Sequence, residues 1–218
     1  MQGRVRMALV LLAVLGAGSP ALGEDLECPD GARLEGEAPP RGVKQWCVLE
    51  DGTQQGPSVF WFSFGRKRVE ANFCKGRLCG VYRQWWDNGQ LEQEGAYEDD
   101  QKHGAFTEWD PDGTVRVFQE YRKGVIHGNS KTWWQNGQPM LELTYVNGEQ
   151  EGPALTWFET GRKKTEGSFR KGRQHGTWTA WYPDGTRRKV AVFDEGEELS
   201  REHFPPAGSD SSTEVENQ

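Results

Sequence analysis

Leucine, isoleucine and valine are scarce in this chain. After the first 23 residues, Leu, Ile, Val and Phe together number 32 of 195 residues, or 16%, whereas a charged chain below roughly 20% is expected to be disordered. The same stretch holds all 10 Trp, all 5 Tyr and all 10 Phe residues, and disordered segments are poor in aromatic side chains. Composition therefore excludes a conventional aliphatic core and argues against disorder.

Acidic residues are absent from residues 1–23, whose only charged groups are Arg4 and Arg6. An apolar run over residues 7–15 follows, and the small residues Ala21 and Gly23 precede Glu24. A run of about 9–12 apolar residues is too short for a transmembrane helix, which needs about 20, and is typical of a cleaved secretory signal. The sequence predicts export to the periplasm or the extracellular space of a bacterium, with no transmembrane anchor after cleavage.

Cysteines are few, and the four in the chain are Cys28, Cys47, Cys74 and Cys79. An even number in an exported protein predicts two disulfides, for which three pairings exist. We favour the nearest neighbours, Cys28 with Cys47 and Cys74 with Cys79. A zinc site is the alternative, disfavoured by the irregular spacing.

The chain also contains a strict 24-residue sequence repeat. Glycine recurs every 24 residues from Gly56 to Gly176. Counting each of these glycines as position 1, position 10 is always Gly, and position 21 is Gly in five of six copies, with Asp100 as the exception. Position 6 is always Trp: Trp61, Trp85, Trp109, Trp133, Trp157 and Trp181. Position 18 is always aromatic: Phe73, Tyr97, Tyr121, Tyr145, Phe169 and Phe193.

Each repeat reads as a β-hairpin. Positions 2–7 and 11–18 are rich in aromatic residues, Thr and Val, and they flank turn signals such as Asp87-Asn88-Gly89. No segment has helical periodicity. Six hairpins predict an all-β fold, an elongated single-layer antiparallel meander of about twelve strands.

Turn chemistry sets the expected faces of this sheet. Pro111 and Pro183 at position 8 cannot donate a ladder hydrogen bond, so we expect a three-residue loop closed by the position-10 glycine. Position 7 then pairs with 11, and 6 with 12. Alternation places positions 6, 12, 14, 16 and 18 on one face, which joins the Trp column to the position-18 rings. The opposite face is expected to be mostly charged and to carry the aromatic residues of position 7: Phe62, Trp86, Trp134, Phe158 and Tyr182.

This pattern of Gly, Trp and Tyr/Phe resembles the MORN repeat, and more closely the variant repeats of YwqK-type antitoxins. The match covers residues 56–199, with a degenerate start around residues 49–52. The resemblance implies a binding scaffold with no catalysis and no cofactor. The signal peptide and the cysteines depart from a cytoplasmic antitoxin.

Four regions follow from these patterns. Residues 1–23 are the signal peptide, 24–55 a disulfide-stapled cap with a degenerate half-repeat, 56–199 the six-repeat array, and 200–218 an acidic disordered tail. Net charge divides accordingly: residues 24–55 carry −5, 56–193 carry +3, and 194–218 carry −7. The acidity at the two ends is expected to guard the open sheet edges against further pairing.

Sites of chemistry are missing from the sequence. His103, His127 and His175 share position 24, but equivalent positions lie two strands, or about 10 Å, apart and cannot share one metal ion. Residues 110–113 lack the ligand spacing of a calcium loop and fit a turn. Because no catalytic triad, carboxylate pair, phosphate loop or nucleic-acid module is present, we predict a protein that is not an enzyme and binds no metal, cofactor or nucleic acid.

Three binding functions remain. The first is a protein partner, as for an antitoxin or immunity protein, held in a groove lined by the six position-6 Trp and the six position-18 rings. The second is a cell-wall or extracellular glycan. The third is an anionic lipid surface contacted by three basic triplets: Arg66, Lys67 and Arg68; Arg162, Lys163 and Lys164; Arg187, Arg188 and Lys189.

Overall fold

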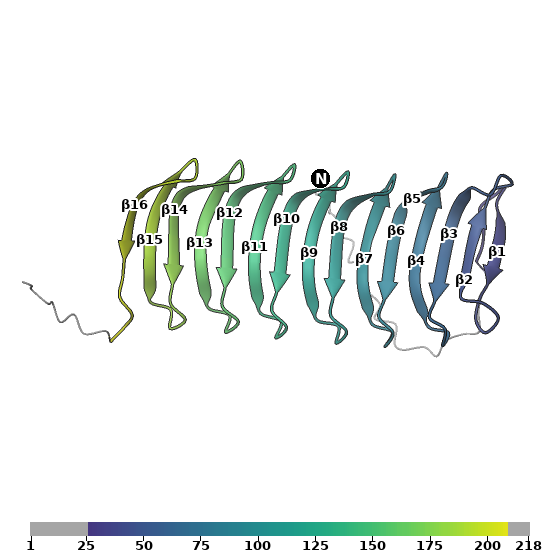
Figure 1. The fold of residues 1–218 in the computed structure, drawn as a ribbon, viewed down its shortest axis with the longest axis horizontal. Helices are drawn as coiled ribbons and strands as arrows, with labels where there is room; N and C mark the ends of the chain where they lie inside the picture. Colours follow the sequence, from purple (N-terminus) through teal and green to yellow (C-terminus); the bar gives the residue numbers. More distant parts are fainter. Residues whose placement is uncertain (1–25, 209–218) are drawn as a thin grey trace, which may run out of the picture.

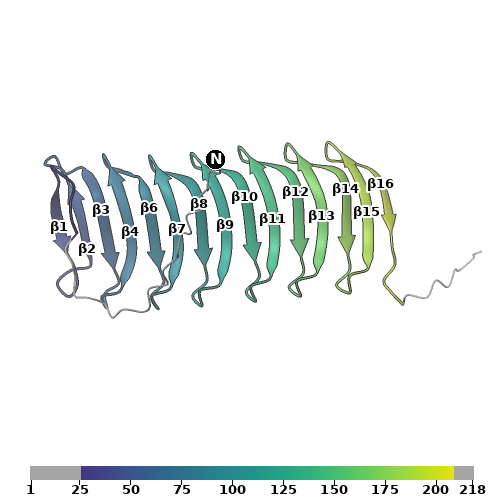
Figure 2. The ribbon, with the colours of Figure 1, turned by 180° about the vertical axis from the view of Figure 1, so that it is seen from behind.

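The computed structural model describes residues 26–208, which form one antiparallel sheet and no helix. Figures 1 and 2 show a single layer with β1 at one end and β16 at the other. This confirms the predicted all-β elongated meander. The signal-peptide prediction lies outside the described residues. The strands are β1 Arg33–Glu37, β2 Lys44–Val48, β3 Gln54–Trp61, β4 Lys67–Cys74, β5 Arg77–Leu78, β6 Gly80–Trp85, β7 Leu91–Glu98, β8 Gln101–Trp109, β9 Val115–Arg122, β10 Val125–Trp133, β11 Pro139–Val146, β12 Glu149–Trp157, β13 Lys163–Arg170, β14 Arg173–Trp181, β15 Arg187–Asp194 and β16 Glu197–His203.

Strands pair in chain order, so each inner strand is hydrogen-bonded to two neighbours and the edge strands β1 and β16 to one. The exception is β5, a short piece that pairs with β4 alone. Six hairpins share one register: β3–β4, β6–β7, β8–β9, β10–β11, β12–β13 and β14–β15.

The turn inside each hairpin is the predicted three-residue loop. In β14–β15, Tyr182 N–H donates to the carbonyl of Thr186 at 2.8 Å, and Gly185 N–H donates back to the carbonyl of Tyr182 at 2.9 Å. Gly185 has a φ of 95°, a conformation that side chains disfavour, and this explains the glycine at position 10. Asp184 accepts from Thr186 N–H at 2.8 Å, which accounts for the Asp or Asn before that glycine.

The turn between hairpins is tighter. Its two central residues, positions 20 and 21, both have positive φ, as in Lys123 (49°) and Gly124 (76°), the signature of a type I′ turn. Asp100 keeps this conformation with a φ of 66°. Its Oδ1 accepts from Leu78 N–H at 2.7 Å, so a side-chain hydrogen bond accompanies the strained backbone that glycine adopts elsewhere.

The two ends of the sheet differ from the array. At the first end, the Cys28–Cys47 disulfide ties the segment before β1 to β2, where Cys47 and Val48 are 1% and 2% exposed. The turn at Leu49 has the hydrogen bonds of the repeat turns, as the degenerate start predicts. At the other end, β16 runs to His203 and pairs with β15, so the predicted start of the tail at residue 200 is wrong. Charged side chains occur along both edge strands, β1 and β16.

Candidate binding surface

A β-bulge in every hairpin decides which side chains share a face. In β6–β7, Gln84 pairs with Gln93 and Trp85 with Leu91, so Glu92 is an extra residue between the pairs. The predicted pair of positions 6 and 12 is confirmed. However, the extra residue at position 13 shifts the alternation of side chains by one. Positions 14, 16 and 18 pair with positions 5, 3 and 1, which lie on the face opposite to position 6. The predicted common face of positions 6 and 18 is therefore wrong.

We name the two faces by their aromatic columns. The tryptophan face carries positions 4, 6, 12, 15 and 17, and the ring-ladder face carries positions 3, 5, 7, 14, 16 and 18. Side-chain contacts agree with this division: Arg83 at position 4 forms an ion pair of 2.6 Å with Glu94 at position 15. On the other face, the Tyr82 hydroxyl donates to Gln84 at 2.8 Å. The twelve rings of the predicted groove are thus divided between two opposite faces.

The ring-ladder face covers itself. Tyr97 and Tyr121 contact Phe106 edge to face, each with ring centroids 5.4 Å apart, and Tyr82 contacts Tyr97 at 5.5 Å. Phe106 is only 2% exposed, although no second layer of residues 26–208 covers the sheet there. Burial raises the pKa of Tyr82, Tyr97 and Tyr121, a desolvation effect that is the largest cause for each hydroxyl. Partly exposed rings of position 18 therefore pack around the buried ring of position 3.

Sequence reasoning missed the position-3 rings of this core. Phe106 lies against Gly95 of the neighbouring strand, where an added Cβ would come within 2.5 Å of the ring. Trp178 covers Gly167 in the same way and contacts Phe169 at 5.1 Å. The signal was present in the sequence as a size complementarity: glycine occupies position 16 in the two repeats that precede these large residues.

Position 7 also lies on the ring-ladder face, not on the charged face that we predicted. Arg68 at position 13 lies over the Phe62 ring at 5.7 Å. The indole N–H of Trp86 donates to the carbonyl of Trp109 at 3.0 Å, and that of Trp134 to the carbonyl of Trp157 at 3.3 Å. These two rings therefore tie the turns of β6–β7 and β10–β11 to the hairpins that follow them.

The tryptophan face presents one Trp per hairpin, each partly exposed. Each Trp pairs across its hairpin with position 12, so the two columns alternate strand by strand in one line, which we call the tryptophan row. Its members in strand order are Trp61, Lys67, Trp85, Leu91, Trp109, Val115, Trp133, Pro139, Trp157, Lys163, Trp181 and Arg187. The middle of the row is therefore apolar, and its two ends carry cations.

The N-terminal segment covers the start of the tryptophan face. Leu26 lines a shallow hollow with Val59 and Val81. Val59 is 5% exposed and its cross-strand neighbour Gln45 3%. Beyond β6, no other described segment covers this face, since residues 33–203 belong to the one sheet and its turns.

The basic triplets do not form one patch. Arg66 and Arg162 donate to carbonyls of the next hairpin turn, those of Asp87 and Pro183, at 3.0 and 2.9 Å. Position 12 points to one face and position 13 to the other, so each triplet straddles the sheet. Two triplets lie on the neighbouring hairpins β12–β13 and β14–β15, while the third lies on β3–β4.

The position-24 side chains serve the turns between hairpins. His127 Nδ1 lies 3.2 Å from Asn147 N–H, and Glu151 accepts from Lys171 N–H at 2.8 Å. The three histidines are spread over three such turns. Within residues 26–208, no three His, Cys, Asp or Glu side chains gather as metal ligands.

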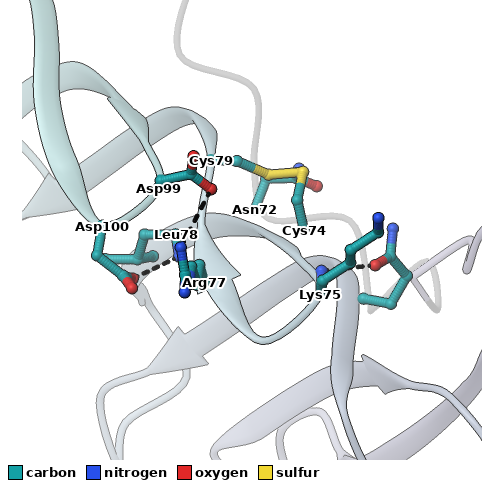
Figure 3. The surroundings of a disulfide bond; sticks show 9 residues. Asn72, Cys74, Lys75, Arg77, Leu78, Cys79, Asp99 and Asp100 are labelled. Atoms are coloured by element: carbon teal, nitrogen blue, oxygen red, sulfur yellow. Dashed lines mark hydrogen bonds and ion pairs between the residues drawn. A yellow bond between two sulfur atoms is a disulfide. The ribbon is translucent and has the colours of Figure 1, made fainter. Parts of the chain in front are cut away.

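The second disulfide occupies one of these turns. Cys74 and Cys79 form a disulfide, which Figure 3 shows, and their Cα atoms are 5.7 Å apart. Both predicted pairings are therefore confirmed. Asn72 lies beside the two sulfur atoms, and its amide nitrogen is 3.2 Å from Cys79 Sγ. The disulfide lies where β5 ends and β6 begins. After the later turns between hairpins, the corresponding residues form one continuous strand, as in β8, β10, β12 and β14.

No helix within residues 26–208 could serve as a membrane span. The search of curated proteins gave no match. A family model described as "MORN repeat variant" matches residues 78–99 and 126–147. These segments correspond to β6–β7 and β10–β11, each from two residues before position 1 to position 20. The closer resemblance to YwqK-type antitoxins stays a prediction. The chain therefore carries repeats of the MORN-repeat-variant family in its β-sheet.

Proposed function

We propose that this protein is an exported, non-enzymatic scaffold that binds a protein partner along its tryptophan row. The observation that carries the proposal is the contrast between the two faces. On the ring-ladder face, several side chains of positions 3 and 16 are buried, with Phe106 and Ala154 at 2% and 3% exposure. The partly exposed Tyr97 and Tyr121 pack against Phe106. The tryptophan face leaves one indole per hairpin partly exposed and in line. The row, not the predicted joint groove, is therefore the binding surface.

Its composition matches that of protein interfaces. Trp is enriched among the residues that contribute most binding energy, and such residues cluster at the centre of an interface within a polar rim. Trp85, Trp109 and Trp133 alternate with Leu91, Val115 and Pro139, and cations flank this apolar stretch. The row thus has an apolar centre and a charged periphery.

The two disulfides support the exported setting, because such bonds persist in non-reducing compartments. The acidic residues of the hairpin turns have a structural role. Asp51, Asp112 and Asp184 have lowered pKa values because Thr residues of their own turns donate to them. Each of these shifts serves a turn, and the three carboxylates lie in separate loops.

Phospholipid binding receives less support. The triplet cations are divided between the two faces and lie on different hairpins, so they form no continuous basic surface. A toxin as partner, which would make the protein immunity-like, rests on the resemblance alone. Glycan binding would use the same exposed indoles, and the test with purified wall polymer distinguishes it from protein binding.

Adjacent tryptophans provide a matched test. Trp85 and Trp133 belong to the row, whereas Trp86 and Trp134 point to the opposite face. Affinity purification of the tagged, exported protein after cross-linking in intact cells should recover one stoichiometric protein. We expect W85A/W133A to lose it and W86A/W134A to retain it, provided that circular dichroism shows both variants folded. Recovery that is unaffected by W85A/W133A, or binding to purified wall polymer instead of a protein, would contradict the proposal.

A further inference from the structure

The spacing of the tryptophan row restricts which ligands can bind along its whole length. Successive row tryptophans lie two strands apart, and strands are about 4.8 Å apart, so the row has a repeat of about 9.6 Å. A ligand that contacts several of these rings in the same way must have a matching repeat along its own axis. The row runs across the strands, so this axis crosses the sheet.

Three regular peptide conformations can be compared with that repeat. A polyproline II helix has three residues per turn and rises about 3.1 Å per residue, which gives about 9.3 Å. An α-helix returns to the same face after seven residues, or about 10.5 Å. Same-face residues of an extended strand recur every 6.8 Å or so. Over the three intervals from Trp85 to Trp157, the mismatch is about 1 Å for polyproline II and about 3 Å for the α-helix.

The chemistry of the row agrees with the spacing. Polyproline II segments are recognised by grooves lined with aromatic rings, which pack against the proline rings without requiring main-chain pairing. The row offers Trp separated by Leu91, Val115 and Pro139, an apolar surface with no side-chain donor apart from the indoles. Each indole remains partly exposed.

Lysines at both ends of the apolar part of the row favour acidic residues at both ends of the bound segment. Lys67 lies one strand before Trp85, and Lys163 lies one strand after Trp157. Both ammonium groups are solvent-accessible, with side chains 55% and 40% exposed. Each forms a surface ion pair with a glutamate three residues on, an interaction that contributes little in water. Acidic residues in a ligand can therefore compete for both lysines.

From these observations we propose that the partner presents a polyproline II segment with proline at every third residue and an acidic residue at each end. Four prolines match Trp85, Trp109, Trp133 and Trp157. The eight strand intervals from Lys67 to Lys163 span about 38 Å, or about twelve residues of polyproline II. The acidic residues therefore lie about two positions outside the first and last prolines. The pattern is symmetric, so either chain direction fits.

This inference rests on the proposed protein-binding function and is tested separately from it. The probe is a 14-residue peptide with Glu at positions 1 and 14, Pro at 3, 6, 9 and 12, and Ser or Ala elsewhere. Titration into the disulfide-bonded mature protein is followed by calorimetry and by tryptophan fluorescence. We expect a dissociation constant in the micromolar range, because a single short row is a small interface. A peptide of the same composition with proline at every fourth residue should bind at least tenfold more weakly.

Variants locate the peptide on the sheet. W85A/W133A should weaken binding at least tenfold, and W86A/W134A less than threefold. K67E/K163E should weaken it similarly, and a peptide with Lys in place of both Glu residues should restore binding to that variant. This charge exchange keeps the test informative where a Trp variant fails to fold.

Several results would overturn the inference. Equal affinity for both proline spacings would show that the repeat of the ligand does not have to match that of the row. Tighter binding of a heptad-patterned helical peptide or of a wall oligosaccharide to the same row would show that the row binds that ligand and not a polyproline II segment. If no peptide binds while the cross-linked partner still depends on Trp85 and Trp133, this inference fails and the proposed function stands. If the partner depends on neither, the proposed function fails as well.

Discussion

The packing of Phe106 against Gly95 yields the sharpest prediction about the fold. Phe106 is 2% exposed, contacts two tyrosine rings edge to face, and lies under the Lys102 ammonium at 4.5 Å from its centroid. Replacing a buried Phe by Ala costs about 3–5 kcal/mol of unfolding free energy. We expect Phe106→Ala to cost about 3 kcal/mol, at the low end, because neighbours in a single layer can collapse into the space.

Gly95 provides the complementary change. Its φ is not positive, so its backbone accepts alanine, but the added methyl would meet the Phe106 ring within 2.5 Å. Overpacking of this kind costs about 1–3 kcal/mol. In the Phe106→Ala background the ring is gone and the methyl fills part of the cavity, so Gly95→Ala should there be neutral or stabilising. The coupling free energy of the double-mutant cycle should therefore be about 2 kcal/mol.

Urea unfolding of the four proteins, followed by circular dichroism and fluorescence, measures this coupling. Linear extrapolation gives each unfolding free energy if the slopes with urea agree. Additive effects, with coupling below about 0.5 kcal/mol, would refute the assignment of positions 3 and 16 to one packed face. A cost for Phe106→Ala below about 1 kcal/mol would show that the ring is not part of a core.

Three further predictions concern the disulfides and the turn residues Asp100 and Asp184. In the loop-entropy model, replacing both cysteines by serine should cost about 3 kcal/mol for Cys28–Cys47 and about 2 kcal/mol for the shorter Cys74–Cys79 loop, as measured by urea unfolding without reductant. Asp100→Ala should cost more than Asp100→Asn, by about 1 kcal/mol in thermal unfolding, because Asn tolerates positive φ and keeps an acceptor for the strand amide. Hydrogen bonds from the side chain and backbone of the following Thr lower the pKa of Asp184, so its contribution to stability is present above its unfolded pKa of about 3.9 and is lost as the pH falls through the lower folded pKa. Asp184→Ala should therefore reduce the stability difference between pH 7 and pH 2, and an undiminished difference would contradict the role of this carboxylate.

Local chemistry made much of the fold predictable. Pro111 and Pro183 excluded a two-residue loop, and the structure has the three-residue loop with its closing glycine. The glycines at positions 10 and 21 marked backbone that requires positive φ. Both disulfides follow from sequence proximity, because each pair joins residues of adjacent chain segments. Each of these features depends on residues close together in sequence.

The faces were not predictable in the same way. A single bulged residue, such as Glu92, inverts every side chain beyond it, and nothing in its residue type distinguishes it from a paired strand residue. This error placed Trp85 with Tyr97 and moved Trp86 to the wrong side. The end of the array was misplaced for a related reason: residues 200–203 are polar, but they pair with the exposed edge of β15, which requires hydrogen bonds and no apolar pattern.

The central claim is that ligand binding occurs on the tryptophan face and not on the ring-ladder face. Val115 and Arg116 are neighbours that point to opposite faces: Val115 pairs with Trp109, and Arg116 reaches Glu108 at 2.7 Å on the ring-ladder side. A photo-reactive phenylalanine analogue can replace either residue without removing a tryptophan. Irradiation of intact cells should cross-link the partner from position 115 and not from position 116. Equal or greater yield from position 116 would contradict the claim.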